Sequence, residues 1–120
     1  MNIGKTGAEG EKRVANFLRQ HGYKIIKRNY QCRFGEIDII AEKSEYIVFV
    51  EVKTRKENSM VSGAAAVDFH KQNRIMSTSN DFIVKTESEL QPRFDVAEVI
   101  VSKKADGSDS YSLNYIKNAF

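Results

Sequence analysis

The feature that most constrains the fold is the segment 35–55, GEIDIIAEKSEYIVFVEVKTR, whose pattern predicts two strands joined by a short turn. Side chains of a strand point alternately to its two faces, so every second residue shares a face. One face of both predicted strands is wholly apolar and must be buried: it carries Ile37, Ile39, Ala41, Val48, Val50 and Val52. The segment therefore predicts a strand pair packed into a core.

The other face of this strand pair brings acidic residues together. If Lys43 pairs with Tyr46 across the turn, Asp38 lies directly opposite Glu51. The Cβ atoms of opposed residues are about 4.5–5.5 Å apart, and like charges at that separation destabilise the pair. A divalent cation such as Mg²⁺ would offset this repulsion, because it binds one or two carboxylates together with water and phosphate oxygens. The two carboxylates are therefore a candidate metal site.

A lysine accompanies these carboxylates. Lys53 lies on the same face as Glu51, about 6.6–6.8 Å along the strand, and the same register places Glu36 opposite Lys53. An ammonium group there can hold a metal-bound water or stabilise charge on a phosphate. The alternative is an exposed ladder of salt bridges, in which each pair contributes only ~0–1 kcal/mol. Ile40, Ile47 and Phe49, at the other end of this face, argue against full exposure. The residues by themselves leave both interpretations open.

The rest of the chain predicts one α/β domain, spanning residues 1–120, in the order αβββαββ around a mixed sheet. Helices are expected over about 8–21 and from near 65 to 84, and strands over 23–30 (an edge strand), 36–42, 46–55, 93–102 and 111–116. Turns or loops are expected at 1–7, 31–35, 56–66 and 105–110, with a break at Gln91-Pro92. In the first helix, periodicity favours a solvated first-turn carboxylate for Glu11.

Composition and motifs exclude several classes of protein. No apolar run approaches the ~20 residues that span a bilayer, and the N-terminus lacks the apolar stretch of a signal peptide. We therefore expect a cytoplasmic protein without a membrane partner. The net charge of +3 permits a nucleic-acid partner without requiring one. Cys32 is the single cysteine, and the zinc-protease, P-loop and serine-hydrolase motifs are missing.

An ordered set of residues resembles the PD-(D/E)XK nuclease superfamily, whose motif is an Asp on one strand and (D/E)-x-K on the next. Here the motif reads Ile37-Asp38 and Glu51-Val52-Lys53, with Ile37 at the place of the Pro. The match extends over nearly the whole chain to the bacterial YraN family, which is related to Holliday junction resolvases. The further matching residues are Gly10-Glu11, Ala15, Leu18, Gly22-Tyr23, Arg28-Asn29, Gly35-Glu36, Val48-Phe49-Val50, Arg55, Gly63, Lys71, Arg93-Phe94-Asp95-Val96 and Asn118-Ala119-Phe120.

The resemblance implies a restriction-endonuclease-like three-layer fold, a central mixed sheet flanked by helices. It also implies that Asp38 and Glu51 ligate Mg²⁺ or Mn²⁺, while Lys53 positions the attacking water. Glu11 would join the site from the first helix, against the solvated position that periodicity favours. The implied function is a metal-dependent endonuclease acting on DNA, with branched, Holliday-junction-like DNA as a candidate substrate. The alternative is a catalytically silent module that binds nucleic acid or a protein partner.

Further residues are implied to support or extend the site. Arg55, Lys71 and Arg74 would contact the DNA backbone, although Lys71 and Arg74 could equally form a solvated helix face. Glu36, Arg93 and Asp95 are expected to support the site, unless Arg93 and Asp95 only pair with each other. By analogy with resolvases, which act as dimers on a symmetric junction, a homodimer is expected.

Overall fold

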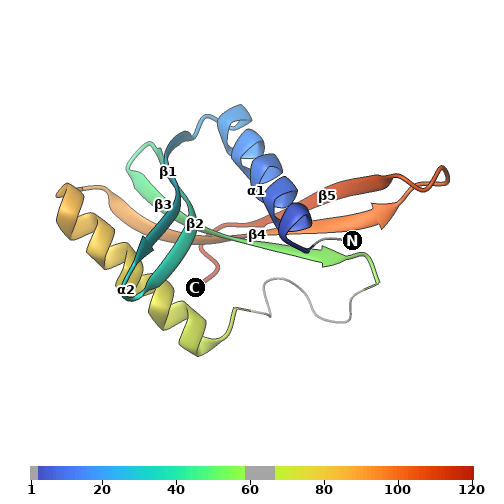
Figure 1. The fold of residues 1–120 in the computed structure, drawn as a ribbon. Helices are drawn as coiled ribbons and strands as arrows, with labels where there is room; N and C mark the ends of the chain where they lie inside the picture. The colour runs from blue at the N-terminus through green and yellow to red at the C-terminus, as the bar shows by residue number, and fades with distance from the viewer. Residues whose placement is uncertain (1–2, 59–66) are drawn as a thin grey trace.

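The computed structural model describes residues 3–58 and 67–120, which form two helices and one five-stranded sheet (Figure 1). The elements are α1 (Ile3–Gln20), β1 (Lys24–Cys32), β2 (Gly35–Lys43), β3 (Tyr46–Lys56), α2 (Phe69–Thr86), β4 (Gln91–Lys103) and β5 (Asp109–Ile116). This order confirms the predicted αβββαββ arrangement, which is consistent with a restriction-endonuclease-like fold. Neither helix in the described ranges is both long enough and apolar enough to cross a membrane.

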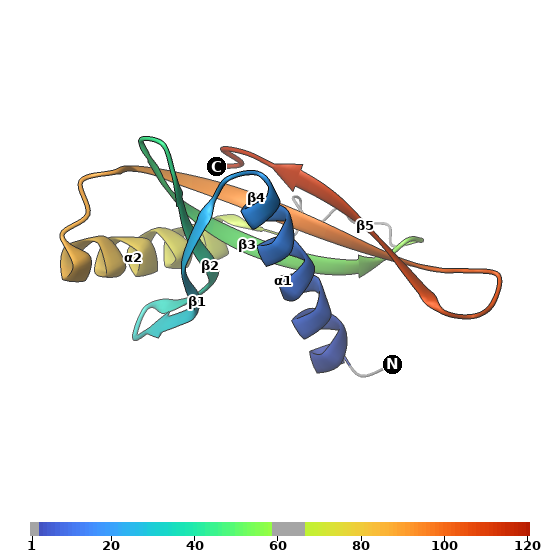
Figure 2. The ribbon, with the colours of Figure 1, turned by 90° about the horizontal axis from the view of Figure 1, so that it is seen from above.

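The sheet is mixed and has the strand order β1-β2-β3-β4-β5, so β1 is the predicted edge strand. β3 and β4 run parallel, whereas the β1–β2, β2–β3 and β4–β5 pairs are antiparallel. A parallel connection needs a crossover, and α2 lies in the connection between β3 and β4. Viewed from above, β1 and β2 run at a steep angle to the long β4–β5 hairpin (Figure 2).

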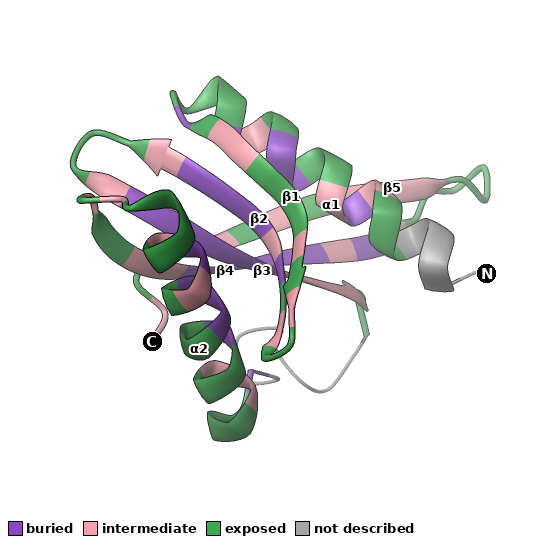
Figure 3. Cartoon of the chain, turned by 60° about the vertical axis from the view of Figure 1, so that its left-hand side comes forward, coloured by how far each residue is buried: buried purple, intermediate pink, exposed green. Residues whose placement is uncertain are grey.

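The two helices cover opposite faces of the sheet and create two hydrophobic clusters (Figure 1). Buried residues concentrate on β2, β3, β4 and the inner sides of the helices (Figure 3). The α1 cluster contains Val14, Ala15, Leu18, Tyr23, Ile39, Ala41, Val48, Val50, Ala97 and Val99. The α2 cluster contains Ile37, Ile40, Ile47, Phe49, Val67, Ile75, Phe82 and Val96.

Several element boundaries differ from the expectation; among them, β5 begins at Asp109, inside the predicted turn 105–110. α1 begins at Ile3 rather than near Ala8, because Gly4 and Gly7 weaken the helical pattern of this stretch. β1 extends to Cys32 and β2 begins at Gly35, so the turn between them is shorter than predicted. The predicted break at Gln91-Pro92 is wrong, since both residues begin β4.

Pro92 fits into β4 because of its place in the sheet. It pairs with Ile47 on the β3 side, whereas β5 covers β4 only from Val96 onwards. The missing N–H of proline is tolerated near the start of a strand and at an unpaired edge. The predicted loop residue Gly63 and the predicted helix start near 65 lie outside the described residues, and α2 begins after its N-cap, Asp68.

The predicted register of β2 and β3 is confirmed from Lys43–Tyr46 to Ile39–Val50, where the ladder ends. The prediction for Ile37 is wrong: it packs in the α2 cluster and not beside Ile39 on the α1 side. Alternation is broken because β2 leaves β3 at this point. The facing strand β1 is also irregular there, with Asn29 at φ 54°. The expected pairings Asp38–Glu51 and Glu36–Lys53 therefore fall beyond the ladder.

Candidate active site

Asp38 lies where β2 and β3 separate. Its Oδ2 accepts a hydrogen bond of 2.7 Å from the backbone N–H of Val52. The carboxylate thus satisfies a donor on β3 that the neighbouring strand no longer reaches, because the ladder ends at Ile39–Val50. This contact holds Asp38 at the opening between the two strands, half-buried and beside the next residues of β3.

Glu51 lies on the α2 side of β3 and is 7% exposed. Its Oε1 is 3.5 Å from Lys53 Nζ and 2.6 Å from Lys71 Nζ. Lys53 comes from the same face of the same strand, as predicted, whereas Lys71 reaches in from the first turn of α2. Asp68, the N-cap of that helix, accepts a 2.8 Å hydrogen bond from the backbone N–H of Lys71 and fixes where its side chain starts.

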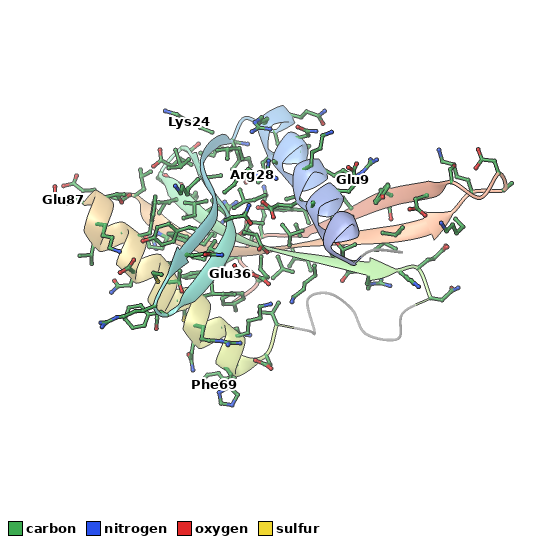
Figure 4. All side chains as sticks on the ribbon, viewed as in Figure 1. Glu9, Lys24, Arg28, Glu36, Phe69 and Glu87 are labelled. Carbon is green, nitrogen blue, oxygen red and sulfur yellow. The ribbon has the colours of Figure 1, made fainter. Side chains whose placement is uncertain are left out.

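Glu11 approaches from the opposite side, on α1. Its Oε1 accepts hydrogen bonds from Arg28 Nε at 3.2 Å and Asn29 Nδ2 at 3.0 Å, and only 14% of its side chain is exposed. The expectation of a solvated first-turn carboxylate is therefore wrong, since α1 begins at Ile3 and Glu11 is held by β1. Arg28 lies on β1 beside α1 (Figure 4).

A glycine lets α1 approach the sheet closely enough for this contact. A Cβ atom on Gly10 would lie only 2.4 Å from Thr54 Oγ1 on β3. The residue next to Glu11 is therefore in direct contact with the strand that carries Glu51 and Lys53. α1 is fixed against β3 at the level of the site.

These groups perturb one another electrostatically. Burial raises the pKa of Asp38 to about 7, the negative charge of Glu51 adds to the rise, the Val52 N–H opposes it, and Glu11 and Glu36 contribute smaller increases. Burial and the neighbouring Lys71 ammonium lower the pKa of Lys53. Burial alone would also lower the pKa of Lys71, but the ion pair with Glu51 outweighs it and the pKa is raised. Burial and the nearby carboxylates thus both disfavour the charged form of Asp38.

The residues present fit a hard divalent cation. In the described ranges no three Asp, Glu, His or Cys side chains are grouped as metal ligands. Asp38 and Glu51 are two carboxylates, the number that suits Mg²⁺, which keeps several of its waters. The raised pKa of Asp38 shows that its charge lacks full compensation, which an added cation would provide.

Two of the predicted DNA-contacting residues differ in their surroundings. Arg55 is held by Glu98, whose Oε1 accepts from Arg55 Nε at 3.0 Å and lies 2.9 Å from Nη2. Arg74 is exposed on α2, close to the β1–β2 turn: a Cβ on Gly35 would be 3.7 Å from Arg74 Cβ. Arg74 is therefore accessible to a ligand, whereas Arg55 is engaged in an internal ion pair.

The three predicted supporting residues occupy two different places. Glu36, labelled in Figure 4, is exposed, and its Oε2 accepts a hydrogen bond from Gln31 Nε2 at 3.1 Å. Arg93 and Asp95 form a two-pronged ion pair at 3.0 and 2.8 Å, and Asp95 is fully buried. The further contacts of this pair are with Tyr23 Oη, Tyr115 Oη and the backbone N–H of Asn118. This network ties β4 to β5 and to the C-terminal residues.

Sequence reasoning missed two features of the site. Glu98, 2% exposed, lies beside Lys53 in the β3–β4 ladder and binds Arg55. A carboxylate inside the apolar run Val96–Val101 was an available signal for a buried acid. Lys71 was assigned to DNA, but no periodicity in the sequence could place its ammonium group on Glu51, because that contact depends on how α2 packs.

Comparison with known proteins identifies relatives whose match includes all of the candidate site residues. Residues 10–99 match the family described as "Uncharacterised protein family UPF0102", the YraN family indicated by the sequence. A UPF0102 protein of Clostridium botulinum strain 657 is 42% identical over 95% of this chain and 92% of the relative. UPF0102 proteins of Caldanaerobacter subterraneus subsp. tengcongensis and Caldicellulosiruptor bescii are 40% and 41% identical, covering 100% of this chain and 98% and 100% of the relatives. The chain belongs to the UPF0102 family.

Proposed function

We propose that this protein is a metal-dependent endonuclease that hydrolyses phosphodiester bonds of DNA, with branched DNA as its substrate class. The observation that carries the proposal is the meeting of Asp38, Glu51 and Lys53 at the opening between β2 and β3. Asp38 is held by Val52, and its raised pKa indicates a site that favours an added positive charge. The preference for branched DNA comes from the resemblance to junction resolvases.

The side chains would divide the work in a simple way. Asp38 and Glu51 would hold Mg²⁺ or Mn²⁺, which when bound neutralises phosphate charge and lowers the pKa of a bound water. Lys53 Nζ, whose lowered pKa eases loss of its proton, is suited to orient the attacking water and to take up a proton from it. Glu11, oriented by Arg28 and Asn29, adds negative charge beside Asp38.

The DNA would lie along the N-terminal half of α2. Arg74 is exposed there, one turn from Lys71, so both can face one phosphate backbone. The net charge of +3 is compatible with this partner. A homodimer would match the two symmetric cut sites of a four-way junction.

Cleavage of a defined DNA panel tests the proposal. Four-way junctions, nicked duplex, linear duplex and single strands are incubated with Mg²⁺, Mn²⁺ or EDTA, and products are resolved on denaturing gels. Wild type should cut with either metal and not in EDTA, and Asp38→Asn or Glu51→Gln should abolish cutting. Lys53→Met should lower the rate by about 100-fold or more, because the group that orients the water and takes up its proton is lost.

Glu89→Gln serves as the matched control, since Glu89 is exposed between α2 and β4. It should cut like wild type. The proposal fails if neither metal supports cutting of any DNA in the panel, or if Glu51→Gln cuts as fast as wild type.

A second candidate function is a non-enzymatic module that binds nucleic acid. It is favoured by the two ammonium groups on Glu51 Oε1, at 2.6 and 3.5 Å, which already neutralise this carboxylate without a metal. Salt-dependent DNA binding that persists in Asp38→Asn and Glu51→Gln, with no cleavage by wild type, would identify this function.

A further inference from the structure

Lys71 occupies an unusual position for a lysine expected to contact DNA. Its Nζ is 2.6 Å from Glu51 Oε1, closer than the 3.5 Å of Lys53, although Lys53 lies only two residues from Glu51 on the same strand. Lys71 lies on α2 and Glu51 lies on β3, so the contact between them is made by tertiary packing. The shorter of these two ion pairs of Glu51 is therefore with the helix and not with its own strand.

Two ammonium groups on one carboxylate oxygen form a crowded arrangement. Glu51 carries one negative charge, so the pair Lys53 and Lys71 overcompensates it. A divalent cation that bound Glu51 would face both ammonium groups at short range. Coulomb repulsion rises steeply as such charges approach, so one ammonium group has to withdraw.

Lys71 is the group that can withdraw. Its side chain is 30% exposed, about the same as the 28% of Lys53, but it reaches the site from the first turn of α2, so its flexible four-carbon stem can swing towards solvent without moving the strand that carries Glu51. The backbone stays in place, because the N-cap Asp68 binds the Lys71 N–H. Release of the side chain therefore leaves the helix intact.

We propose that Lys71 is an internal counter-ion of Glu51, which competes with the divalent cation and moves to a DNA phosphate when the cation binds. This rests on the proposed function, because it takes Asp38 and Glu51 as the ligands of the cation. The cost of displacing Lys71 weakens cation binding in the absence of DNA. A DNA phosphate near α2 then recovers that cost, so cation and DNA bind cooperatively.

Binding of Mn²⁺ without DNA tests the competition directly. The loss of the electron paramagnetic resonance signal of free Mn²⁺ measures its affinity for wild type, Lys71→Met, Lys71→Arg and Lys85→Met. Lys71→Met should bind Mn²⁺ about 2- to 5-fold more tightly, the effect expected for removing a partly exposed ion pair. Lys71→Arg keeps the charge and should bind like wild type.

Lys85→Met is the matched control. Lys85 lies on the same helix and pairs with Asp81 at 3.0 Å on the surface, with 64% of its side chain exposed. It should leave the Mn²⁺ affinity unchanged. A purely structural role for Lys71 predicts the opposite of competition, namely weaker Mn²⁺ binding in Lys71→Met.

Junction binding in Ca²⁺, measured by fluorescence anisotropy over a salt series, tests the second half of the proposal. Lys71→Met should lose about one unit of the slope of log affinity against log salt, because one phosphate contact is removed. An unchanged slope overturns the transfer of Lys71 to DNA.

The Mn²⁺ results also separate failure of this inference from failure of the proposed function. If wild type binds Mn²⁺ and Asp38→Asn does not, but Lys71→Met binds no more tightly than wild type, the competition is refuted and the metal site stands. If wild type fails to bind and Lys71→Met binds, the competition is supported in its strongest form. If neither binds Mn²⁺, both the metal site and the inference are refuted.

Discussion

Asp38 should destabilise the metal-free protein at neutral pH, and Asp38→Asn should therefore stabilise it. Burial and the charge of Glu51 raise the pKa of Asp38 from 3.8 to about 7. Because the folded-state pKa lies above the unfolded-state value, the folded protein binds more protons in this interval. The free energy of unfolding contributed by Asp38 is thus highest below pH 4 and falls as the pH rises to about 7.

The magnitude follows from the interval between these two pKa values. At about 1.36 kcal/mol per pH unit, the interval from 3.8 to about 7 corresponds to about 4 kcal/mol. Asparagine has nearly the same shape, keeps an oxygen that accepts from the Val52 N–H and carries no charge. The variant should therefore gain up to about 4 kcal/mol over wild type at pH 8 in EDTA, and nothing below about pH 4.

Urea denaturation between pH 4 and 8, followed by far-UV circular dichroism, measures the difference. The experiment is run in EDTA and repeated with Mn²⁺, where the advantage of the variant should shrink because only wild type gains the binding free energy of the cation. Glu89→Gln, which removes an exposed carboxylate, should show no pH-dependent difference from wild type. Equal or lower stability of Asp38→Asn at pH 8 in EDTA would refute the electrostatic account of the site.

Two further predictions concern how the site is supported. Gly10→Ala should cost about 1–3 kcal/mol, because its Cβ would lie 2.4 Å from Thr54 Oγ1 and force α1 away from β3. Gly7→Ala, with nothing within 4 Å of the added Cβ, should not lower stability, because alanine is the better helix former, and a loss of equal size there would contradict the steric explanation. Asp95→Ala should cost about 3–5 kcal/mol in urea denaturation, because the partly buried Arg93 loses its two-pronged partner. Adding Arg93→Met should recover part of that loss, and no recovery would contradict the ion-pair explanation.

Much of the fold was predictable from local pattern. The turn between Lys43 and Tyr46 and the alternation on either side placed β2 and β3 in their observed register as far as Ile39–Val50. The order of helices and strands followed from the change between helical and strand periodicity. These features depend on residues close in sequence, so they can be read without knowing the partners of each element.

The residues of the candidate site were predictable from the sequence, but their arrangement in space was not. Asp38 was expected to face Glu51 across a regular ladder, but it binds the Val52 N–H where the strands separate. The opening coincides with an irregularity of a third strand, the positive φ of Asn29, which carries no signal in the Asp and Glu-x-Lys motif itself. The site is therefore shaped by a departure from regular pairing.

Arg93 and Asp95 illustrate a second limit. Their spacing of two on one strand face allowed them to pair with each other, and they do. That Asp95 also binds Tyr115 Oη and the Asn118 N–H depends on how β5 and the C-terminal residues pack against β4. Such contacts join residues distant in sequence, and no periodicity reports them.

The residue pattern alone determined the apolar strand pair, its turn and the acidic and basic residue types that it carries, because alternation and turn chemistry act over a few neighbouring residues. Only the tertiary structure decided that Lys71, expected to contact DNA, pairs with Glu51, and that Glu11 is held by β1. These contacts depend on where two helices dock on opposite faces of the sheet. Docking is set by the packing of whole hydrophobic clusters, and such packing cannot be derived from any single segment.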